Sequence, residues 1–474
     1  MIDITNLTIR SAHKLLVEKD IKAEELTTEF SKRAEELNPQ LNSYITLTQN
    51  EAQKQAKKVD ELIADNQQIS PLAGIPIAVK DLFCTKGTKT TAASNVLKNY
   101  VPPYDATVVT KLKDANAVFV GKTNLDAWAH GSSGENSDFG PTKNPYDLKR
   151  VPGGSSSGSA AAVASSTALA ATGTDTGGSI RLPASFCNLV GLKPTYGRVS
   201  RYGIIAMASS LDSIGHFTKT VFDNALVLNQ TAGQDQLDAT TSPKIPDDYT
   251  KEIERGVKGL KIGLPKEYFQ SLDTKVKDLI LSAVKKLESL GAEIVEISLP
   301  HTEQGIATYY IIQPSEVSSN LARYDGMRFG NTRDAFGQEA KRRIILGTYT
   351  LSSGYYDAYY LKAMKVRRLM REDFTNAFNP SADGVDVIIA PTSPTPPFKL
   401  GEKTNDPLAM YLSDIFTPTI NLACVPSLNV PCGFLQGLPM GMQIIGPDFS
   451  EKLLYQVAYA YEQETKWYET KPKI

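Results

Sequence analysis

The sequence predicts an α/β fold with a large, mixed and mostly parallel sheet that is covered by helices on both faces. Short apolar runs that end in Gly, Pro or polar residues recur along the 474 residues, as expected of buried strands. Amphipathic helix patterns separate these runs. Residues 260–299 give a strand, a helix and a second strand in succession, and such a crossover favours parallel pairing.

The first seventy residues have a helical pattern. Apolar residues between 26 and 37 share one face of a helix that is expected to stop at Asn38-Pro39, and residues 52–63 repeat the arrangement. We therefore expect a helical layer at residues 1–70. Buried strands follow at 75–79 and 117–120, with a helix over 107–116 between them.

The remaining elements come after a Gly/Ser-rich loop at residues 153–158, which leads into an Ala-dominated helix pattern over 159–172. The polar residues 231–250 are expected to cross the surface between lobes. We accordingly divide the chain into the helical layer 1–70, a core over 71–230 that holds the chemistry, and a substrate-recognition side over 231–474. Later segments are a strand at 260–264, a helix over 276–287, strands at 293–299, 385–390 and 442–445, and a last helix capped by Ser450.

Composition places few limits on the function. Lys and Arg number 51 against 52 Asp and Glu, a net charge of -1, so no whole-chain basic field supports non-specific nucleic-acid binding. The four cysteines have no metal-ligand spacing, and we expect reduced thiols and no metal site. The N-terminus lacks a signal-peptide pattern and no run reaches about 18 apolar residues, so a cytoplasmic location is expected.

The most informative stretch is Gly173 to Arg181, Gly-Thr-Asp-Thr-Gly-Gly-Ser-Ile-Arg. Glycines reach positive φ at little cost, so Gly177 and Gly178 let neighbouring N–H groups point into one small space in front of Ser179. Such an arrangement suits a nucleophile with its oxyanion hole. A tight turn followed by an ordinary serine is the alternative interpretation.

Other catalytic motifs are poorly supported. The four histidines show no recognisable partnership, which argues against a Ser-His-Asp triad. Residues 154–158 match G-x-S-x-G, but the residues before them do not form a strand pattern, as that motif requires. Gly121-Lys122-Thr123 ends like a P-loop, but Asn116 stands where the first glycine is needed. An ATP-consuming step is therefore not expected on this chain.

With histidine poorly supported as the base, Lys80 is the candidate. It stands at the carboxyl end of the apolar strand 75–79, where ligands bind in α/β sheets. A lysine that is half neutral at pH 7 needs its pKa lowered by about three units, within the range that burial produces. The alternative is a structural pair between Lys80 and its neighbour Asp81.

Lys80, the run from Pro152 to Ser159 and the stretch from Gly173 to Arg181 together resemble the amidase signature family. The resemblance implies the fold of that family and a Ser-cisSer-Lys triad. Ser179 would be the nucleophile, Ser155, preceded by a cis peptide bond, the bridging serine, and Lys80 the base. The N–H groups of Thr176, Gly177, Gly178 and Ser179 would form the oxyanion hole. The sequence departs from the family pattern at Ser157 and Leu182.

Several further stretches, at 193–203, 208–212, 315–321 and 352–360, are similar to the glutamine-hydrolysing subunits of aspartyl/glutamyl-tRNA amidotransferases. The resemblance implies a heterotrimer with subunits B and C. In it, released ammonia converts Glu-tRNA(Gln) to Gln-tRNA(Gln), or Asp-tRNA(Asn) to Asn-tRNA(Asn), and the tRNA is held mainly by the B subunit. It implies no cofactor on this chain, and ATP and Mg on the partner. The alternatives are a stand-alone amidase of small or aryl amides and a non-catalytic assembly subunit.

Glutamine recognition needs a cation for the α-carboxylate and an anion for the α-ammonium, because burying either charge unpaired is costly. The resemblance puts these roles on Arg343 and Asp414, with Arg342 and Asp406 as alternatives. Taken alone, residues 341–343 are typical of a solvated helix face. The resemblance adds three residues to the lining of the same pocket: Tyr309, Gly131 and Ser132.

Overall fold

One sheet of eleven strands runs through the computed structural model of the protein, which describes residues 3–327 and 331–474. The strand order is β1-β3-β2-β4-β6-β5-β10-β11-β9-β7-β8. The strands are β1 (Tyr44–Leu47), β2 (Pro76–Lys80), β3 (Val118–Thr123), β4 (Ala170–Asp175), β5 (Val190–Lys193), β6 (Ser213–Thr218), β7 (Lys261–Pro265), β8 (Glu293–Ile297), β9 (Val387–Pro391), β10 (Ser427–Leu435) and β11 (Leu438–Ile445).

The sheet is mixed, as expected, but it is not mostly parallel. Of the ten neighbouring pairs in the described chain, four are parallel, namely β2 with β3, β2 with β4, β7 with β8 and β7 with β9. The other six are antiparallel. The strand–helix–strand unit at residues 260–299 does pair in parallel, so that prediction is confirmed.

The longest antiparallel pair explains why the prediction of a mostly parallel sheet was wrong. Strands β10 and β11 are separated only by Gln436 and Gly437, which both have positive φ, 54° and 78°. Two residues of positive φ form a tight turn whose twist matches that of a hairpin, so the chain reverses at once. No helical crossover fits in this connection.

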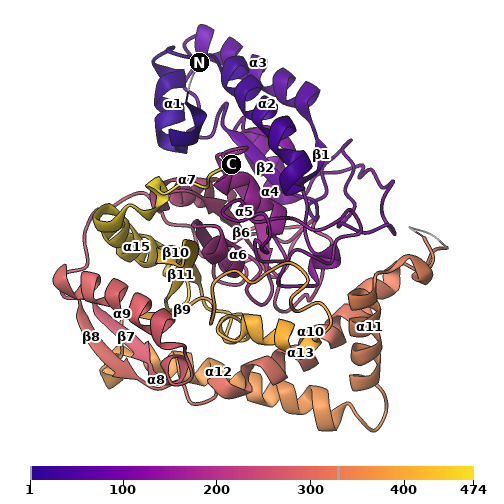
Figure 1. Ribbon diagram of the computed structural model, residues 1–474, viewed down its shortest axis with the longest axis vertical. Coiled ribbons are helices and arrows are strands. Elements are labelled where there is room, and N and C mark those ends of the chain that lie inside the picture. Colours follow the sequence, from indigo (N-terminus) through magenta and orange to yellow (C-terminus); the bar gives the residue numbers. More distant parts are fainter. Residues whose placement is uncertain (1–2, 328–330) are drawn as a thin grey trace.

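Fifteen α-helices in the described chain pack against this sheet and against one another (Figure 1). Helices α1–α3 lie at one end of the molecule and α8 and α12 at the other. The helices are α1 (Ile9–Val17), α2 (Ala23–Leu41), α3 (Gln49–Ala64), α4 (Thr107–Asp114), α5 (Ser157–Ala164), α6 (Arg181–Phe186), α7 (Val221–Thr231), α8 (Lys266–Phe269), α9 (Thr274–Ser289), α10 (Gly305–Asn320), α11 (Gln338–Thr350), α12 (Lys362–Ala377), α13 (Pro407–Tyr411), α14 (Pro418–Leu422) and α15 (Glu451–Thr465).

The Ala-rich segment 159–172 differs from its prediction as one helix. Helix α5 ends at Ala164, and β4 begins at Ala170. The Thr167 hydroxyl donates to Ala162 O at 3.0 Å, and Ser166 has a left-handed φ of 58°. Hydroxyl groups that bond to the backbone in this way compete with the helix and end it. The small residues that follow are buried in the sheet between β2 and β6.

The N-terminal segment contains the helices that were expected, and it also adds a strand. Its strand β1 pairs antiparallel with β3 at the end of the sheet. Helix α2 runs through Pro39 to Leu41 and is followed by Asn42 in a left-handed conformation, φ 51°. The expected stop at Asn38-Pro39 was therefore early. Among the residues that the structure describes, no helix is long and apolar enough to cross a membrane.

Candidate active site

Two neighbouring parallel strands bring the candidate residues to one edge of the sheet. Strand β2 ends at Lys80 and β4 ends at Asp175, and the two are paired in parallel. Because their carboxyl ends lie at the same edge, the loop 176–180 after β4 emerges beside Lys80. The loop 153–156 before α5 reaches the same place, since Ser156 N–H donates to Ser179 O at 3.3 Å.

Lys80 is fully buried among hydroxyl groups. Its Nζ lies 3.0 Å from Ser155 Oγ, 2.9 Å from Ser156 Oγ and 2.8 Å from Thr174 Oγ1. Burial lowers the pKa of Lys80 to about 7, although nearby aspartates act to raise it. A neutral amine has two N–H groups and one lone pair, so it can donate to two of these hydroxyls and accept from the third.

The alternative pairing of Lys80 with Asp81 does not occur. Asp81 instead forms a buried ion pair with Lys122, at 3.1 Å, and accepts a hydrogen bond from Thr91 N–H at 2.8 Å. The peptide bond between Gly154 and Ser155 is cis, as the family resemblance implies. Residues 144–153 form no regular strand, so the alternative of a G-x-S-x-G elbow lacks its required strand.

The Ser179 loop is held by a buried ion pair between Asp175 and Arg181, at 3.0 Å. Burial alone would raise the pKa of the Asp175 carboxyl, but the Arg181 guanidinium holds it below its usual range. Asp175 also accepts the N–H of Gly178 at 2.8 Å. The Gly178 N–H is thus already bonded, whereas the N–H groups of Gly177 and Ser179 make no hydrogen bond within the described chain.

Close approaches explain both glycines of this loop. A Cβ on Gly177 would lie 2.5 Å from the Tyr309 ring, and a Cβ on Gly178 would overlap the Thr417 hydroxyl. Gly178 also has a φ of 127°, which side chains disfavour. Thr417 Oγ1 donates to Gly177 O at 2.6 Å, and Thr176 Oγ1 donates to Asp212 Oδ1 at 2.7 Å. The loop therefore has little freedom to move.

Arg343 lies on the inner side of α11 and is 3% exposed, so it does not belong to a solvated helix face. Its Nε donates to Glu339 at 2.8 Å and its Nη1 to Gln313 at 2.9 Å. The alternative residue Arg342 is 42% exposed and pairs with Glu339 on the surface. The structure thus brings Arg343, and not Arg342, toward Tyr309. The Arg343 charge acts to lower the pKa of the Tyr309 phenol.

Asp414 is also buried, whereas its alternative Asp406 is exposed and caps α13. Burial raises the pKa of Asp414 to about 8, and the Arg343 charge and the Ser132 hydroxyl act in the opposite direction. Asp414, Ser132 and Arg343 therefore belong to one polar cluster. Binding of a cation beside Asp414 would favour its ionised form.

Asp126 is a buried residue of the site that was not predicted. Its carboxylate accepts the N–H of Gly134 at 3.0 Å, and a Cβ on Gly131 or Gly154 would collide with it. Burial raises its pKa to about 7. It therefore joins the turn at Gly131 to the loop that carries Ser155. No periodicity or motif marks Asp126, because its role depends on how the fold places Gly131 and Gly154 against its carboxylate.

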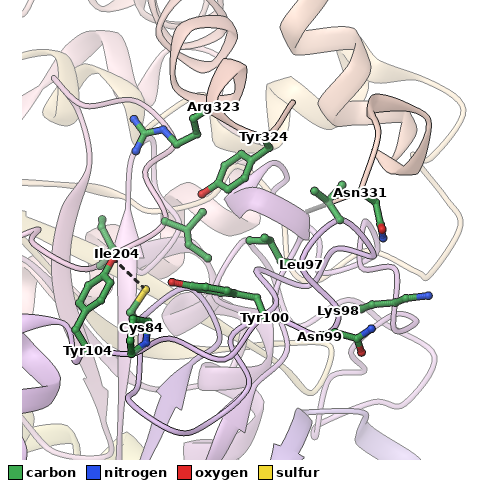
Figure 2. A pocket seen from close by; sticks show the side chains of 13 residues that line it. Cys84, Leu97, Lys98, Asn99, Tyr100, Tyr104, Ile204, Arg323, Tyr324 and Asn331 are labelled. Atoms are coloured by element: carbon green, nitrogen blue, oxygen red, sulfur yellow. Dashed lines mark hydrogen bonds between the residues drawn. The ribbon is translucent and has the colours of Figure 1, made fainter. Parts of the chain in front are cut away.

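A separate cavity of about 720 Å³ contains none of the predicted site residues. Figure 2 shows Tyr100, Tyr104 and Tyr324 around it, with Cys84 Sγ 3.8 Å from the Tyr104 hydroxyl. All four cysteines are free. In residues 3–327 and 331–474, no group of three or more His, Cys, Asp or Glu side chains could hold a metal ion.

Comparison with known proteins identifies the family. A family model described as Amidase matches residues 25–455. The chain belongs to this amidase family. Two relatives of this amidase are named as the A subunit of glutamyl-tRNA(Gln) amidotransferase. The protein from Heliobacterium modesticaldum is 53% identical, over 98% of each chain, and that from Carboxydothermus hydrogenoformans is 55% identical, over 96% of each.

Solved structures agree with this assignment. The A subunit of the glutamyl-tRNA(Gln) amidotransferase of Thermotoga maritima is 44% identical, with a TM-score of 0.83, and the match covers 98% of this amidase and 96% of that chain. A bacterial aryl acylamidase of the amidase signature family is 26% identical, with a TM-score of 0.87 over 98% and 97% of the two chains. The α/β amidase fold that the sequence predicted is thus confirmed.

Proposed function

We propose that this chain is the glutamine-hydrolysing subunit of a tRNA-dependent amidotransferase, and that Ser179, Ser155 and Lys80 are its catalytic residues. The observation that carries the catalytic part is the buried Lys80 amine, 3.0 Å from Ser155 Oγ and beside the Ser179 loop. The names of relatives that match over nearly the whole chain support the glutamine-hydrolysing role.

In the proposed reaction, Ser179 Oγ attacks the side-chain carboxamide carbon of glutamine. Its proton passes to Ser155 Oγ, whose own proton passes to the neutral Lys80 Nζ. The N–H groups of Gly177 and Ser179, with that of Thr176, stabilise the oxyanion. When the C–N bond breaks, the proton returns through Ser155 to the leaving nitrogen and ammonia departs. Water then releases glutamate from Ser179 by the same proton path.

Gly178 has a different part in this proposal from the one that the family resemblance implies. Its N–H donates to Asp175 at 2.8 Å, so it orders the loop and does not have to contact the oxyanion. Arg343 would bind the α-carboxylate of glutamine and Asp414 its α-ammonium. Tyr309 and the turn of Gly131 and Ser132 would close the pocket around the carboxamide.

Partner subunits are the second part of the proposal. Subunits B and C would complete a heterotrimer, with ATP and Mg bound on the partner. Ammonia would convert Glu-tRNA(Gln) to Gln-tRNA(Gln), with Asp-tRNA(Asn) as a second acceptor. An exposed apolar surface supports such assembly, because large patches of this kind mark interaction sites. We call it the tyrosine cluster; it comprises Ile345, Leu346, Tyr349, Leu351, Tyr355, Tyr356 and Tyr359.

A stand-alone amidase of aryl amides is the second candidate, favoured by the structural similarity to the aryl acylamidase. The buried Arg343 and Asp414 argue for a substrate with both charges, which aryl amides lack. Glutamine hydrolysis with and without subunits B and C, charged tRNA and ATP separates the two functions. A marked rise with the partners supports the amidotransferase, and preference for an aryl amide supports the alternative.

Ser179→Ala tests the nucleophile. We expect glutamine hydrolysis to fall by at least about a thousandfold, because removal of a nucleophile leaves only binding and oxyanion stabilisation. The melting temperature should change by less than about 2 °C, since Ser179 contributes little to the core. Ammonia release is measured in the same preparation as thermal unfolding. Retained hydrolysis in the folded variant contradicts the proposed role.

A further inference from the structure

The side-chain nitrogen of Gln313, on α10, is buried and has no hydrogen-bond partner within the described residues. Its oxygen accepts a hydrogen bond from Arg343 Nη1 at 2.9 Å. A guanidinium has donors and no acceptor, so the amide atom that faces it is the oxygen. The NH2 group of Gln313 is thereby directed away from Nη1. A buried donor left unpaired is unusual enough to require a reason.

The existing partners of Arg343 determine how it could bind a substrate carboxylate. Arg343 Nε is bonded to Glu339 at 2.8 Å, and Glu339 also accepts a hydrogen bond from the Tyr411 hydroxyl at 3.2 Å. Glu339 also pairs with Arg342, so Glu339 balances only part of the positive charge of Arg343. Its Nη2 donates no hydrogen bond within residues 3–327 and 331–474. A second carboxylate at Nη2 would need further neutral donors.

Two other groups place this unpaired donor beside the site. Tyr309 lies one turn before Gln313 on α10, and the two therefore share a face of the helix. The Tyr309 ring is the group that approaches Gly177 in the Ser179 loop. His130 has both ring nitrogens buried and unpartnered in the described chain, and burial and the Arg343 charge keep its pKa well below the usual value. The surroundings of Arg343 thus hold several unpaired, uncharged polar atoms.

We propose that Gln313 Nε2 donates a hydrogen bond to the α-carboxylate of the substrate, next to Arg343 Nη2, and so selects amides that bear a carboxylate. The inference rests on the proposed function of glutamine hydrolysis at Ser179. Gln313 is a binding residue in this reaction and takes no part in proton transfer. Its loss should therefore affect KM far more than kcat.

The test compares L-glutamine with 4-aminobutanamide, which has the same carboxamide and amine but no carboxylate. Each is assayed with the full chain in its complex with subunits B and C. For Gln313→Leu we expect KM for glutamine to rise by about tenfold to a hundredfold, the usual effect of losing a hydrogen bond to a charged group. We expect kcat for glutamine to change by less than about threefold. We expect kcat/KM for 4-aminobutanamide to match that of the wild-type enzyme.

Gln313→Glu is the second variant, because it keeps the size of the side chain and its contact with Arg343 while it puts an anion where the NH2 group was. It should raise KM for glutamine at least as much as Gln313→Leu. Ser315→Ala is the matched control. Ser315 is a buried polar residue of the same helix whose hydroxyl contacts Ile311 O and Thr350 at 2.7 and 2.6 Å, and its loss should leave the preference for glutamine unchanged.

An unchanged KM for glutamine in both Gln313 variants overturns the proposal. So does an equal loss on both substrates, which would mean that Gln313 only supports the fold. Failure of the proposed function looks different, because the unchanged enzyme would then not hydrolyse glutamine. In that event glutaramate and butanamide, an amide pair with and without a carboxylate, take the place of glutamine and 4-aminobutanamide. The effect of each Gln313 variant on the two substrates is then compared in the same way.

Discussion

Lys80 and Lys122 are both buried lysines, and they differ in whether a carboxylate contacts the amine. Lys122 pairs with the Asp81 carboxylate, whereas Lys80 contacts three hydroxyl groups. Burial lowers the pKa of both. A carboxylate partner keeps an amine charged, and hydroxyl partners can serve its neutral form equally well. Lys80 is therefore the residue of the two that suits a base.

The pKa of Lys80, lowered by burial to about 7, predicts how activity depends on pH. The base acts when neutral, so kcat should rise with pH through about 7 and fall by roughly fiftyfold between pH 7 and pH 5. In kcat/KM the ionisation of Asp414, with a pKa of about 8, should steepen the same rise. Steady-state assays from pH 5 to 9 measure both.

Lys80→Arg provides the control for this profile. Arginine stays charged at every pH tested, so the variant should be inactive throughout while it remains folded. A kcat of the unchanged enzyme that is constant from pH 5 to 8 contradicts the neutral-lysine base. Activity of Lys80→Arg comparable with that of the unchanged enzyme contradicts it equally.

At the scale of elements, the connection from β4 to α6 is fixed at both ends. Asp175, the last residue of β4, pairs with Arg181, the first of α6. Arg181 also donates to Gln443 on β11 at 2.8 Å and to Asn421 on α14 at 2.6 Å. The short loop that carries Ser179 is thus oriented by contacts with the C-terminal part of the sheet and by a helix beside it.

Gly177→Ala tests this rigidity. The new Cβ would lie 2.5 Å from the Tyr309 ring, so either the hydrogen-bonded loop or the buried tyrosine would have to shift. We expect glutamine kcat/KM to fall by at least about tenfold and the free energy of unfolding to fall by about 1–3 kcal/mol. Kinetics and chemical denaturation measure the two effects.

Gly337→Ala is the matched control, because its new Cβ has only Asp138 Oδ1 nearby, at 3.6 Å. Gly337 precedes α11 with a φ of -64°, which alanine adopts readily. Its activity and stability should stay close to those of the unchanged protein. If the two alanine variants behaved alike, the close approach of Tyr309 would not explain Gly177.

At the scale of the whole molecule, the tyrosine cluster lies on the end of α11 and the segment that follows it, at the side of the molecule away from the N-terminal helices (Figure 1). Its rings contact one another, with Tyr349 and Tyr355 centroids 4.3 Å apart. Arg343, on the same helix, faces inward. A partner bound to the cluster would therefore contact the helix that carries a proposed substrate-binding residue.

Tyr355→Ser combined with Tyr359→Ser tests the cluster as an interface with the partner subunits. Tyrosines at the centre of an interface often contribute strongly, so we expect the affinity for subunits B and C to fall by at least about tenfold. Glutamine hydrolysis by the isolated chain should change by less than about twofold. Leu237→Ser, at a residue 63% exposed in another region, is the control. Unchanged assembly of the double variant contradicts the assignment.

The sequence by itself determined the features that depend on short stretches of chain. The strand ending at Lys80 and the unit formed by β7, α9 and β8 follow from local apolar periodicity, which is present before any contact forms. Family resemblance pointed to Arg343 and Asp414, which the structure buries together. The roles proposed for Ser155, Ser179 and Lys80 stay predictions that the variants above test.

Only the tertiary structure decided which groups meet across long separations. It paired Lys80 with hydroxyls and Asp81 with Lys122, bonded the Gly178 N–H to Asp175, and set Gln313 beside Arg343. It also made the sheet predominantly antiparallel. The physical reason is the same in each case: burial, pKa and hydrogen-bond partners depend on residues far away in the chain, and periodicity describes only the neighbours along it.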